Sequence, residues 1–152
     1  MIAYHDPDRQ PAPQELTAMA DFRRVTDTFT TSPQIDVADV ARAKADGVVL
    51  IIDNRPDEED PAAPQSADIA RAAAEAGIRF VHIPVVGGPT PEQVAAMRAA
   101  IDEAGGGKVL AYCRSGTRSI NTWSLGQPEV GREKLVELGA AAGYDLSNVL
   151  PR

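Results

Sequence analysis

The sequence of 152 residues has one cysteine, few aromatic residues and no long apolar run. A single cysteine excludes an internal disulfide, a zinc cluster built on cysteines and any reaction that needs a second, resolving cysteine in the same chain. The longest apolar run, residues 47–52, is far shorter than the ~20 residues of a membrane-spanning helix. Residues 1–8 lack the basic and apolar segments of a secretion signal. We therefore expect a cytoplasmic protein without a membrane partner.

Clustered positive charge is also missing. Lys and Arg number 15 against 22 Asp and Glu, and the formal net charge is −7 at pH 7. A protein that binds nucleic acid by displacing counterions from phosphates needs a basic patch, but the sequence has no run of five or more basic residues. We therefore expect no nucleic-acid partner. The 43% of hydrophobic residues is close to the average of globular proteins, so the chain can bury a core.

Short apolar runs alternate with helix-like segments through most of the chain. Residues 48–52, 78–81 and 108–112 predict buried parallel strands, and residues 25–31 predict an edge strand. Helices are predicted over residues 36–46, 66–76, 90–104, 118–126 and 129–142. This order predicts an α/β fold with a central, mostly parallel sheet flanked by helices. We expect residues 25–152 to form a single domain, preceded by a weakly ordered, proline-containing leader over residues 1–24.

The strongest chemical signal is the lone Cys113, which ends a predicted buried strand on a short turn before a helix. Sites in parallel sheets form beyond the carboxyl ends of the strands. The N–H groups of such a turn and the helix dipole favour an anion, and therefore the thiolate form of the side chain. We identify Cys113 as the candidate nucleophile. The alternative is a small buried side chain without chemistry.

The residues after the cysteine complete this turn. Gly116 lets the backbone turn without a Cβ, and Arg118 can present two parallel donors to an oxyanion held over the sulfur. Ser119 can donate to the sulfur or cap the helix. Three further candidates for anion binding in the same turn are Arg114, Ser115 and Thr117. The turn therefore has the composition of an anion-binding loop centred on a thiolate.

Two more candidates leave the neighbouring strand at the same end of the sheet. Asn54 and Arg55 can orient the cysteine loop or bind an anionic substrate, or they can be an ordinary turn residue and a surface charge. His82 ends the next strand, where a structural, hydrogen-bonded histidine is expected. The acidic run over residues 57–60 is interpreted as a solvated loop. We predict no metal site and no cofactor.

The segment Tyr112–Ser119 resembles the active loop of rhodanese-type sulfurtransferases, a cysteine followed by four residues and an arginine. The chain from about residue 29 to residue 145 resembles the bacterial beta-lactamase-hydrolase-like family, named for its phosphatase-like domain. The segments that carry this second resemblance are residues 51–57, 81–85, 90–93, 112–119 and 142–146. It implies the tyrosine/dual-specificity phosphatase fold, and members are described as phosphatases and as sulfurtransferases. It also implies a persulfide-oxidising metallo-hydrolase as a partner.

Two sequence features separate these activities. Cysteine phosphatases have five residues between cysteine and arginine, whereas residues 114–117 are four, a tighter loop that suits a sulfur atom better than a phosphoryl group. Phosphatases of this fold take an aspartate as general acid from the loop after the preceding strand, but residues 84–89 contain no carboxylate. Sulfur transfer between thiols needs no such acid, because a thiolate leaves more readily than an alkoxide.

We therefore expect a sulfurtransferase that moves sulfane sulfur through a Cys113 persulfide. Its donor would be a small anion, thiosulfate or glutathione persulfide, and its acceptor a thiol or cyanide. One alternative is a phosphatase that forms a thiophosphoryl intermediate on Cys113, with a phosphoester as substrate. A second alternative is an inactive module that binds anions or phosphate groups in the same loop.

Overall fold

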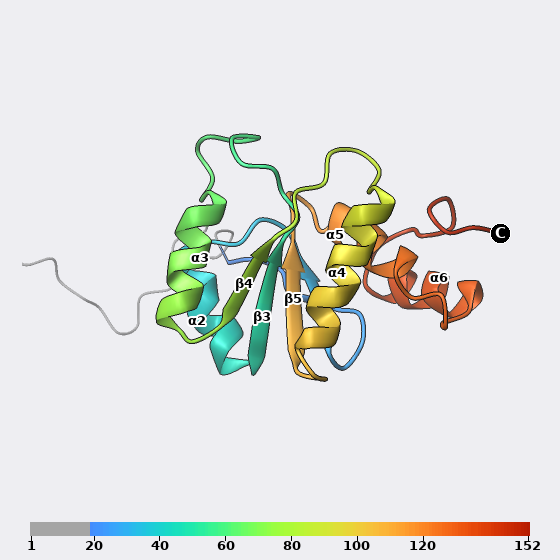
Figure 1. The fold of residues 1–152 in the computed structure, drawn as a ribbon, viewed down its shortest axis with the longest axis horizontal. Coiled ribbons are helices and arrows are strands. Elements are labelled where there is room, and N and C mark those ends of the chain that lie inside the picture. Colours follow the sequence, from blue (N-terminus) through green and yellow to red (C-terminus); the bar gives the residue numbers. More distant parts are fainter. Residues whose placement is uncertain (1–18) are drawn as a thin grey trace, which may run out of the picture.

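The computed structural model describes residues 19–152, in which a five-stranded sheet lies between two layers of helices (Figure 1). The strands are Arg23–Arg24 (β1), Phe29–Ser32 (β2), Val48–Asp53 (β3), Arg79–His82 (β4) and Lys108–Tyr112 (β5). The helices are Val37–Ala45 (α2), Ser66–Glu75 (α3), Pro91–Glu103 (α4), Thr117–Leu125 (α5) and Arg132–Ala141 (α6). The order is β1-β2-β5-β3-β4, and every pair is parallel except β1 with β2. The predicted fold class is confirmed.

From Leu50 on β3 and from Val109 on β5, the side chains are buried on both faces of the sheet, to which successive side chains of a strand point in turn. On β3, Leu50 and Ile52 belong to the core formed with α4, α5 and α6, whereas Ile51 belongs to the core formed with α2 and α3. In the first core, Phe29 and Trp123 stack with their ring centroids 4.8 Å apart. Burial on both faces explains why these strands appear in the sequence as uninterrupted apolar runs.

Two predicted boundaries are wrong. The strand predicted over residues 25–31 begins only at Phe29 and does not lie at an edge, because the N–H groups of Val25 and Thr26 both donate to the carbonyl of Phe29 in a turn. That turn folds β1 back onto β2, so β1 is the edge strand. The last helix begins at Arg132 instead of residue 129, since the preceding residues form a turn and Gly131 caps the helix.

Of the predicted leader, residues 1–18 lie outside the described residues. Within the part that is described, Ala20 is buried and its carbonyl accepts a hydrogen bond from Arg42 at 2.5 Å. The guanidinium of Arg42 also lies over the ring of Phe22, 3.7 Å from its centroid. Residues 20–24 therefore pack against α2 and β2, while the weak order of the leader as a whole stays a prediction.

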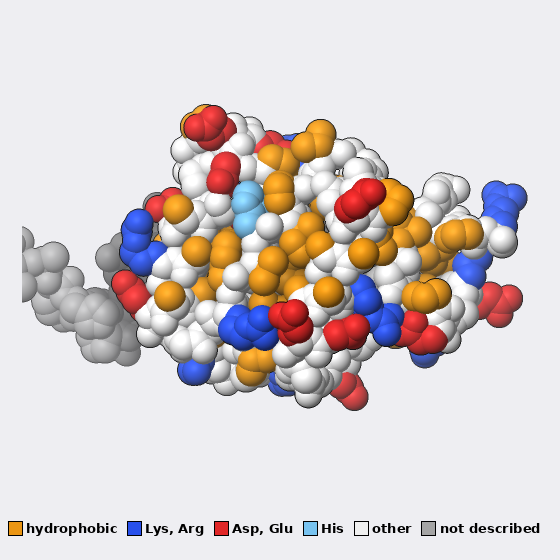
Figure 2. Space-filling model, viewed as in Figure 1, with side chains coloured by type: hydrophobic (Ala, Val, Ile, Leu, Met, Phe, Trp, Pro, Cys, Tyr) orange, Lys and Arg blue, Asp and Glu red, His pale blue; other side chains and the backbone are white. Residues whose placement is uncertain are grey.

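The surface carries charges of both signs. On the face in Figure 2, Lys and Arg side chains lie singly among Asp and Glu, and apolar side chains are visible between α3 and α4. Across residues 19–152, every helix is too short or too polar to cross a membrane.

Candidate functional site

Three loops meet at the carboxyl ends of the parallel strands. They are residues 54–65 after β3, 83–90 after β4 and 113–116 after β5, and Figure 1 shows the first two arching over the same end of the sheet. The sheet topology thus brings together the cysteine loop and the candidates that follow β3, as expected for a site at the strand ends.

Cys113 directly follows β5 and is completely buried. The N–H of Gly116 donates to its Sγ across 3.1 Å. Gly116 has φ of +92° and is the residue from which α5 begins, so the sulfur lies at the positive end of that helix dipole. A left-handed residue at this position favours glycine, which is the role predicted for Gly116.

The cysteine loop is held from outside by Tyr144, a residue that sequence reasoning did not assign to the site. Its Oη donates to the carbonyl of Ser115 across 3.2 Å and accepts from Oγ1 of Thr31, also at 3.2 Å. A Cβ on Gly116 would lie only 2.2 Å from this Oη. Gly116 therefore has two reasons to be glycine, its φ and the close approach of Tyr144.

Arg118 joins the three loops beside the sulfur. Its Nη1 and Nη2 donate to the two carboxylate oxygens of Glu59 at 2.8 and 2.7 Å, and Nη1 also donates to the carbonyl of Val85 at 3.0 Å. The hydrogen bond to Glu59 is the main cause that raises the pKa of Arg118, and the electrostatic interaction with Cys113 raises it further. The two parallel donors predicted for an oxyanion are present, but they face Glu59.

Glu59 also bonds the second arginine of the site. Its Oε1 accepts from Nε of Arg55 at 2.9 Å, and Nη1 of Arg55 donates to the side chain of Gln34 at 3.0 Å. The N–H of Gln34 in turn donates to the carbonyl of Arg114 in the cysteine loop. Arg118 first, and then Arg55, lower the pKa of Glu59 to about 2, so this carboxylate is ionised at neutral pH.

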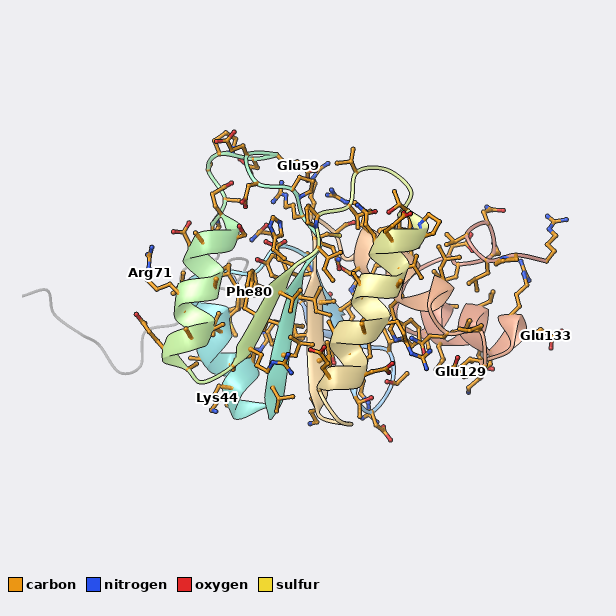
Figure 3. All side chains as sticks on the ribbon, in the orientation of Figure 1. Lys44, Glu59, Arg71, Phe80, Glu129 and Glu133 are labelled. Atoms are coloured by element: carbon orange, nitrogen blue, oxygen red, sulfur yellow. The ribbon has the colours of Figure 1, made fainter. Side chains whose placement is uncertain are left out.

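The acidic run that contains Glu59 is therefore more than the solvated loop that its composition indicated. Nothing local marks Glu59 among its acidic neighbours, because its bidentate partner Arg118 follows β5 and is distant in the sequence, although Arg55 lies only four residues before Glu59 in the same loop. Figure 3 labels Glu59 where the loops after β3 and β4 approach each other.

Asn54 is buried and ties the strand ends together, while its Oδ1 has no hydrogen-bond partner among the described residues. Its N–H donates to the carbonyl of Tyr112 at 2.8 Å, and its side-chain Nδ2 donates to the carbonyl of Ile83 at 3.0 Å. It thus bridges the ends of β5 and β4. Arg55, by contrast, reaches the cysteine loop through Gln34. Of the two candidates after β3, Asn54 has a structural position and Arg55 is part of the charged cluster.

The remaining candidates differ in their placement. Ser119 is completely buried, but its Oγ has no hydrogen-bond partner among the described residues, so the predicted donation to sulfur is not formed. Arg114, Ser115 and Thr117 are exposed. The hydroxyl of Ser115 donates to that of Thr117 at 3.0 Å, which stiffens the outer side of the loop.

Three side chains near this site have the atom types of metal ligands. Oxygens of Asp53 and Asp57 and a ring nitrogen of His82 lie within 4.8 Å of one another. Both oxygens of Asp57 already accept from Ser66 at the start of α3, at 2.8 and 2.6 Å, and Nε2 of His82 donates to the carbonyl of Arg55 at 2.9 Å. Burial raises the pKa of Asp53 above its usual range. These bonds fix the loop after β3, and His82 is the hydrogen-bonded histidine expected.

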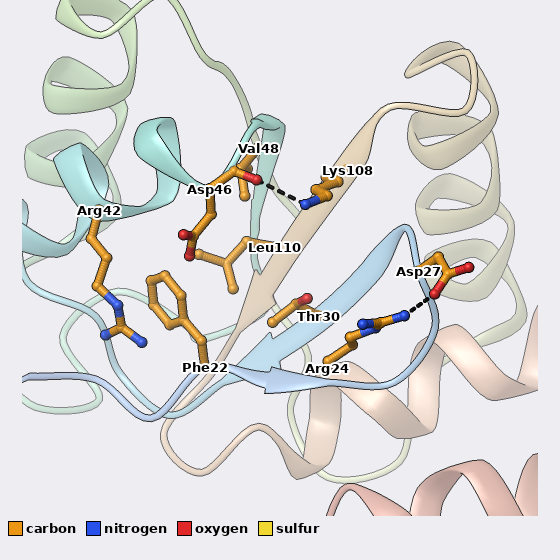
Figure 4. A pocket seen from close by; sticks show the side chains of 9 residues that line it. All are labelled: Phe22, Arg24, Asp27, Thr30, Arg42, Asp46, Val48, Lys108 and Leu110. Atoms are coloured by element: carbon orange, nitrogen blue, oxygen red, sulfur yellow. Dashed lines mark hydrogen bonds and ion pairs between the residues drawn. The ribbon is translucent and has the colours of Figure 1, made fainter.

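A hollow of about 550 Å³ is separate from this site (Figure 4). It lies where β3 and β5 begin, at the end of the sheet opposite the cysteine loop. Its lining residues are Phe22, Arg24, Asp27, Thr30, Arg42, Asp46, Val48, Lys108 and Leu110. Lys108 donates to the carbonyl of Asp46 at 3.0 Å, and Arg24 pairs with Asp27. Its basic groups are thus engaged by neighbouring residues.

A buried cysteine at the end of a central strand, followed by a glycine turn and an arginine in the first turn of a helix, places the chain in the cysteine-phosphatase-like class. The family model described as "Beta-lactamase hydrolase-like protein, phosphatase-like domain" matches residues 21–130. The chain belongs to this family.

Individual relatives agree with this assignment. A beta-lactamase hydrolase-like protein of Agrobacterium fabrum is 32% identical over 127 residues, which are 81% of this chain and 29% of the relative. The chain thus spans about three-tenths of that relative's length. A candidate phosphatase of Neisseria meningitidis Z2491 is 30% identical with a TM-score of 0.72, and the match covers 86% of this chain and 92% of that one.

The fold alone is shared with more distant cysteine phosphatases. Tk-PTP in its active form is 19% identical with a TM-score of 0.66, over 83% of this chain and 87% of that one. These matches confirm the predicted phosphatase fold. The names of the relatives favour the phosphatase alternative over the sulfurtransferase that the sequence led us to expect.

Proposed function

We propose that the chain is a cysteine-dependent sulfurtransferase that carries sulfane sulfur from a small donor to a thiol or cyanide as a persulfide on Cys113. The observation that carries the proposal is the bidentate pairing of Arg118 with Glu59. In a phosphatase this guanidinium has to hold the phosphoryl oxygens throughout the reaction. Here an ionised carboxylate holds the Nη1 and Nη2 pair of the guanidinium's donors, whereas a sulfur atom on Cys113 needs neither of them.

The absence of a carboxylate that could act as general acid in residues 83–90 also supports sulfur transfer over phosphate-ester hydrolysis. Hydrolysis of a phosphomonoester needs a general acid that protonates the leaving alkoxide. Residues 83–90, which would supply it, contain no carboxylate. Glu59 has a pKa of about 2, so at neutral pH it has no proton to give. The groups present therefore suit a leaving group that departs as an anion, such as sulfite or a thiolate.

The proposed reaction with thiosulfate has two steps. The Cys113 thiolate attacks the outer sulfur; a new S–S bond forms on Sγ while the bond in the donor breaks, and sulfite leaves with the electron pair. A thiolate or cyanide then attacks the outer sulfur of the persulfide, and the Cys113 thiolate is released. The N–H of Gly116 stabilises the sulfur anion at both stages. A persulfide-oxidising metallo-hydrolase is the partner that this reaction would serve.

Phosphate-ester hydrolysis is the second candidate, and the comparisons favour it. The family is described by its phosphatase-like domain, and the Neisseria relative is named as a candidate phosphatase. In this alternative Cys113 attacks phosphorus, Arg118 exchanges Glu59 for the phosphoryl oxygens, and water protonates the leaving group. Such an enzyme would work best on aryl phosphates, because their leaving groups need little protonation.

Intact-mass spectrometry separates the candidates. The parent and the Cys113→Ser variant are exposed briefly to thiosulfate or glutathione persulfide. Sulfur transfer predicts a gain of one sulfur atom on the parent only, and cyanide removes that atom as thiocyanate. No gain from either donor, together with turnover of an aryl phosphate by the parent only, would replace the proposal with the phosphatase. Neither activity, with anion binding retained in the variant, would leave a binding module.

A further inference from the structure

Glu59 lies against Arg118 in the geometry of a bound oxyanion. Its two oxygens accept from Nη2 and Nη1 of Arg118 at 2.7 and 2.8 Å, the parallel arrangement that arginine forms with phosphate, sulfate or a substrate carboxylate. One of these oxygens also accepts from Arg55 at 2.9 Å. A side chain of the protein itself therefore occupies the Nη1 and Nη2 pair of Arg118 and Nε of Arg55, and an oxyanion can use these donors only by displacing it.

We propose that Glu59 is a specificity-determining residue that competes with oxyanions for Arg118 and Arg55 and thereby selects persulfide donors over thiosulfate. A persulfide end carries at most one negative charge and no oxygen atoms, so it can reach Cys113 without taking these donors. Thiosulfate carries two charges and three oxygens on its inner sulfur, and to bind through these donors it has to displace Glu59. The choice of donor rests on the proposed function, but the competition for oxyanions does not.

The cluster is built so that the carboxylate can leave while the arginines stay. The side chain of Glu59 is 32% exposed, whereas those of Arg118 and Arg55 are 18% and 10% exposed. Arg118 keeps its bond to the carbonyl of Val85, and Arg55 keeps its bond to Gln34. An oxyanion that displaces Glu59 would thus meet two preorganised guanidinium groups. The competing carboxylate lowers the apparent affinity of these groups for the oxyanion.

The neighbouring Glu58 provides a matched control. It carries the same charge on the same loop and is exposed, and among the described residues its side chain makes neither an ion pair nor a hydrogen bond. Glu58→Gln therefore changes the net charge as Glu59→Gln does, without releasing an arginine.

The test measures binding of sulfate, phosphate and thiosulfate by calorimetry at neutral pH, for the parent, Glu59→Gln and Glu58→Gln. Release of a charge-assisted bidentate pair predicts about tenfold tighter binding of each oxyanion to Glu59→Gln, and less than about twofold change for Glu58→Gln. Sulfur loading is then followed by mass, and the ratio of the thiosulfate rate to the glutathione persulfide rate should rise by a similar factor in Glu59→Gln only.

Unchanged or weaker oxyanion binding in a folded Glu59→Gln variant would overturn the proposal and leave Glu59 as a structural ion pair. Glu59→Ala repeats the measurement with a side chain that cannot retain a hydrogen bond to Arg118, and a melting curve establishes that each variant is folded. If neither the parent nor any variant gains sulfur by mass, the proposed function fails. The calorimetric comparison still decides whether Glu59 competes with oxyanions.

Discussion

Glu59 and Arg118, 59 positions apart in the sequence, meet in a two-point ion pair that closes the charged side of the site. Glu59 comes from the loop after β3, and Arg118 from the first turn of α5. The pair adds a link between two loops that the bond from Asn54 N–H to the carbonyl of Tyr112 already holds close, so it contributes to the fold as well as to the chemistry.

The stability of the protein should depend on the ionisation of Glu59. Its pKa is lowered from an ordinary value of 4.5 to about 2 in the folded state. The carboxylate therefore stabilises the fold above pH 4.5, and this contribution is lost as the pH falls through 4.5 towards 2. Thermal unfolding of the parent and Glu59→Gln over this range should show a difference in Tm that shrinks with falling pH. A difference that stays constant would contradict the ion pair.

Gly116→Ala should damage the cysteine loop. A left-handed φ costs a residue with a Cβ about 1–2 kcal/mol, and the new Cβ would collide with Tyr144 Oη. We expect a loss in the free energy of unfolding of at least this size in urea titrations, and little or no sulfur loading on Cys113. Gly88→Ala is the control, because a Cβ there has nothing within 4 Å. Equal effects of both substitutions would show that the clash is relieved.

Tyr144→Phe should loosen the same loop without a collision. It removes the hydroxyl that bonds the carbonyl of Ser115, and such a bond contributes about 1 kcal/mol. We expect a small fall in Tm but a clear slowing of persulfide formation, because the loop that holds the sulfur is less well fixed. The rate of sulfur loading measured well below Tm separates the two effects. A variant with the parent's rate would limit Tyr144 to a packing role.

Trp123→Ala should be among the most destabilising substitutions in the chain. Trp123 is buried and stacks on Phe29 where α5 covers the sheet, and removal of a buried indole costs about 3–5 kcal/mol. Chemical denaturation should report this loss directly. Val37→Ala, on the exposed start of α2, should change the free energy of unfolding by less than about 0.5 kcal/mol. A loss at Trp123 no larger than this control would contradict the packing described here.

The sheet and the cysteine loop could be predicted from the sequence because their signals are local. The apolar run of β3 and the run Lys108–Tyr112 mark strands buried on both faces, and Thr90 with Pro91 marks the start of α4. Parallel strands place their carboxyl ends together, so the proximity of Arg55 to the cysteine loop also followed from the order of the elements.

Contacts between distant segments could not be predicted in this way. The antiparallel return of β1 depends on a turn at Val25, and the role of Tyr144 depends on where the chain after α6 passes the cysteine loop. Each is set by the packing of elements that are far apart in the sequence, for which a single sequence holds no periodic signal.

By itself, the sequence determined that a lone cysteine ends a buried strand and that an arginine follows five positions later. Only the tertiary structure decided that Glu59 occupies this arginine. The residue type determines which chemical group a side chain carries. The partner of a charged group depends on which loops the fold brings within hydrogen-bond distance. In this protein the contact of 2.7 Å from Nη2 of Arg118 to Oε1 of Glu59 joins two residues whose positions in the sequence give no sign of their pairing.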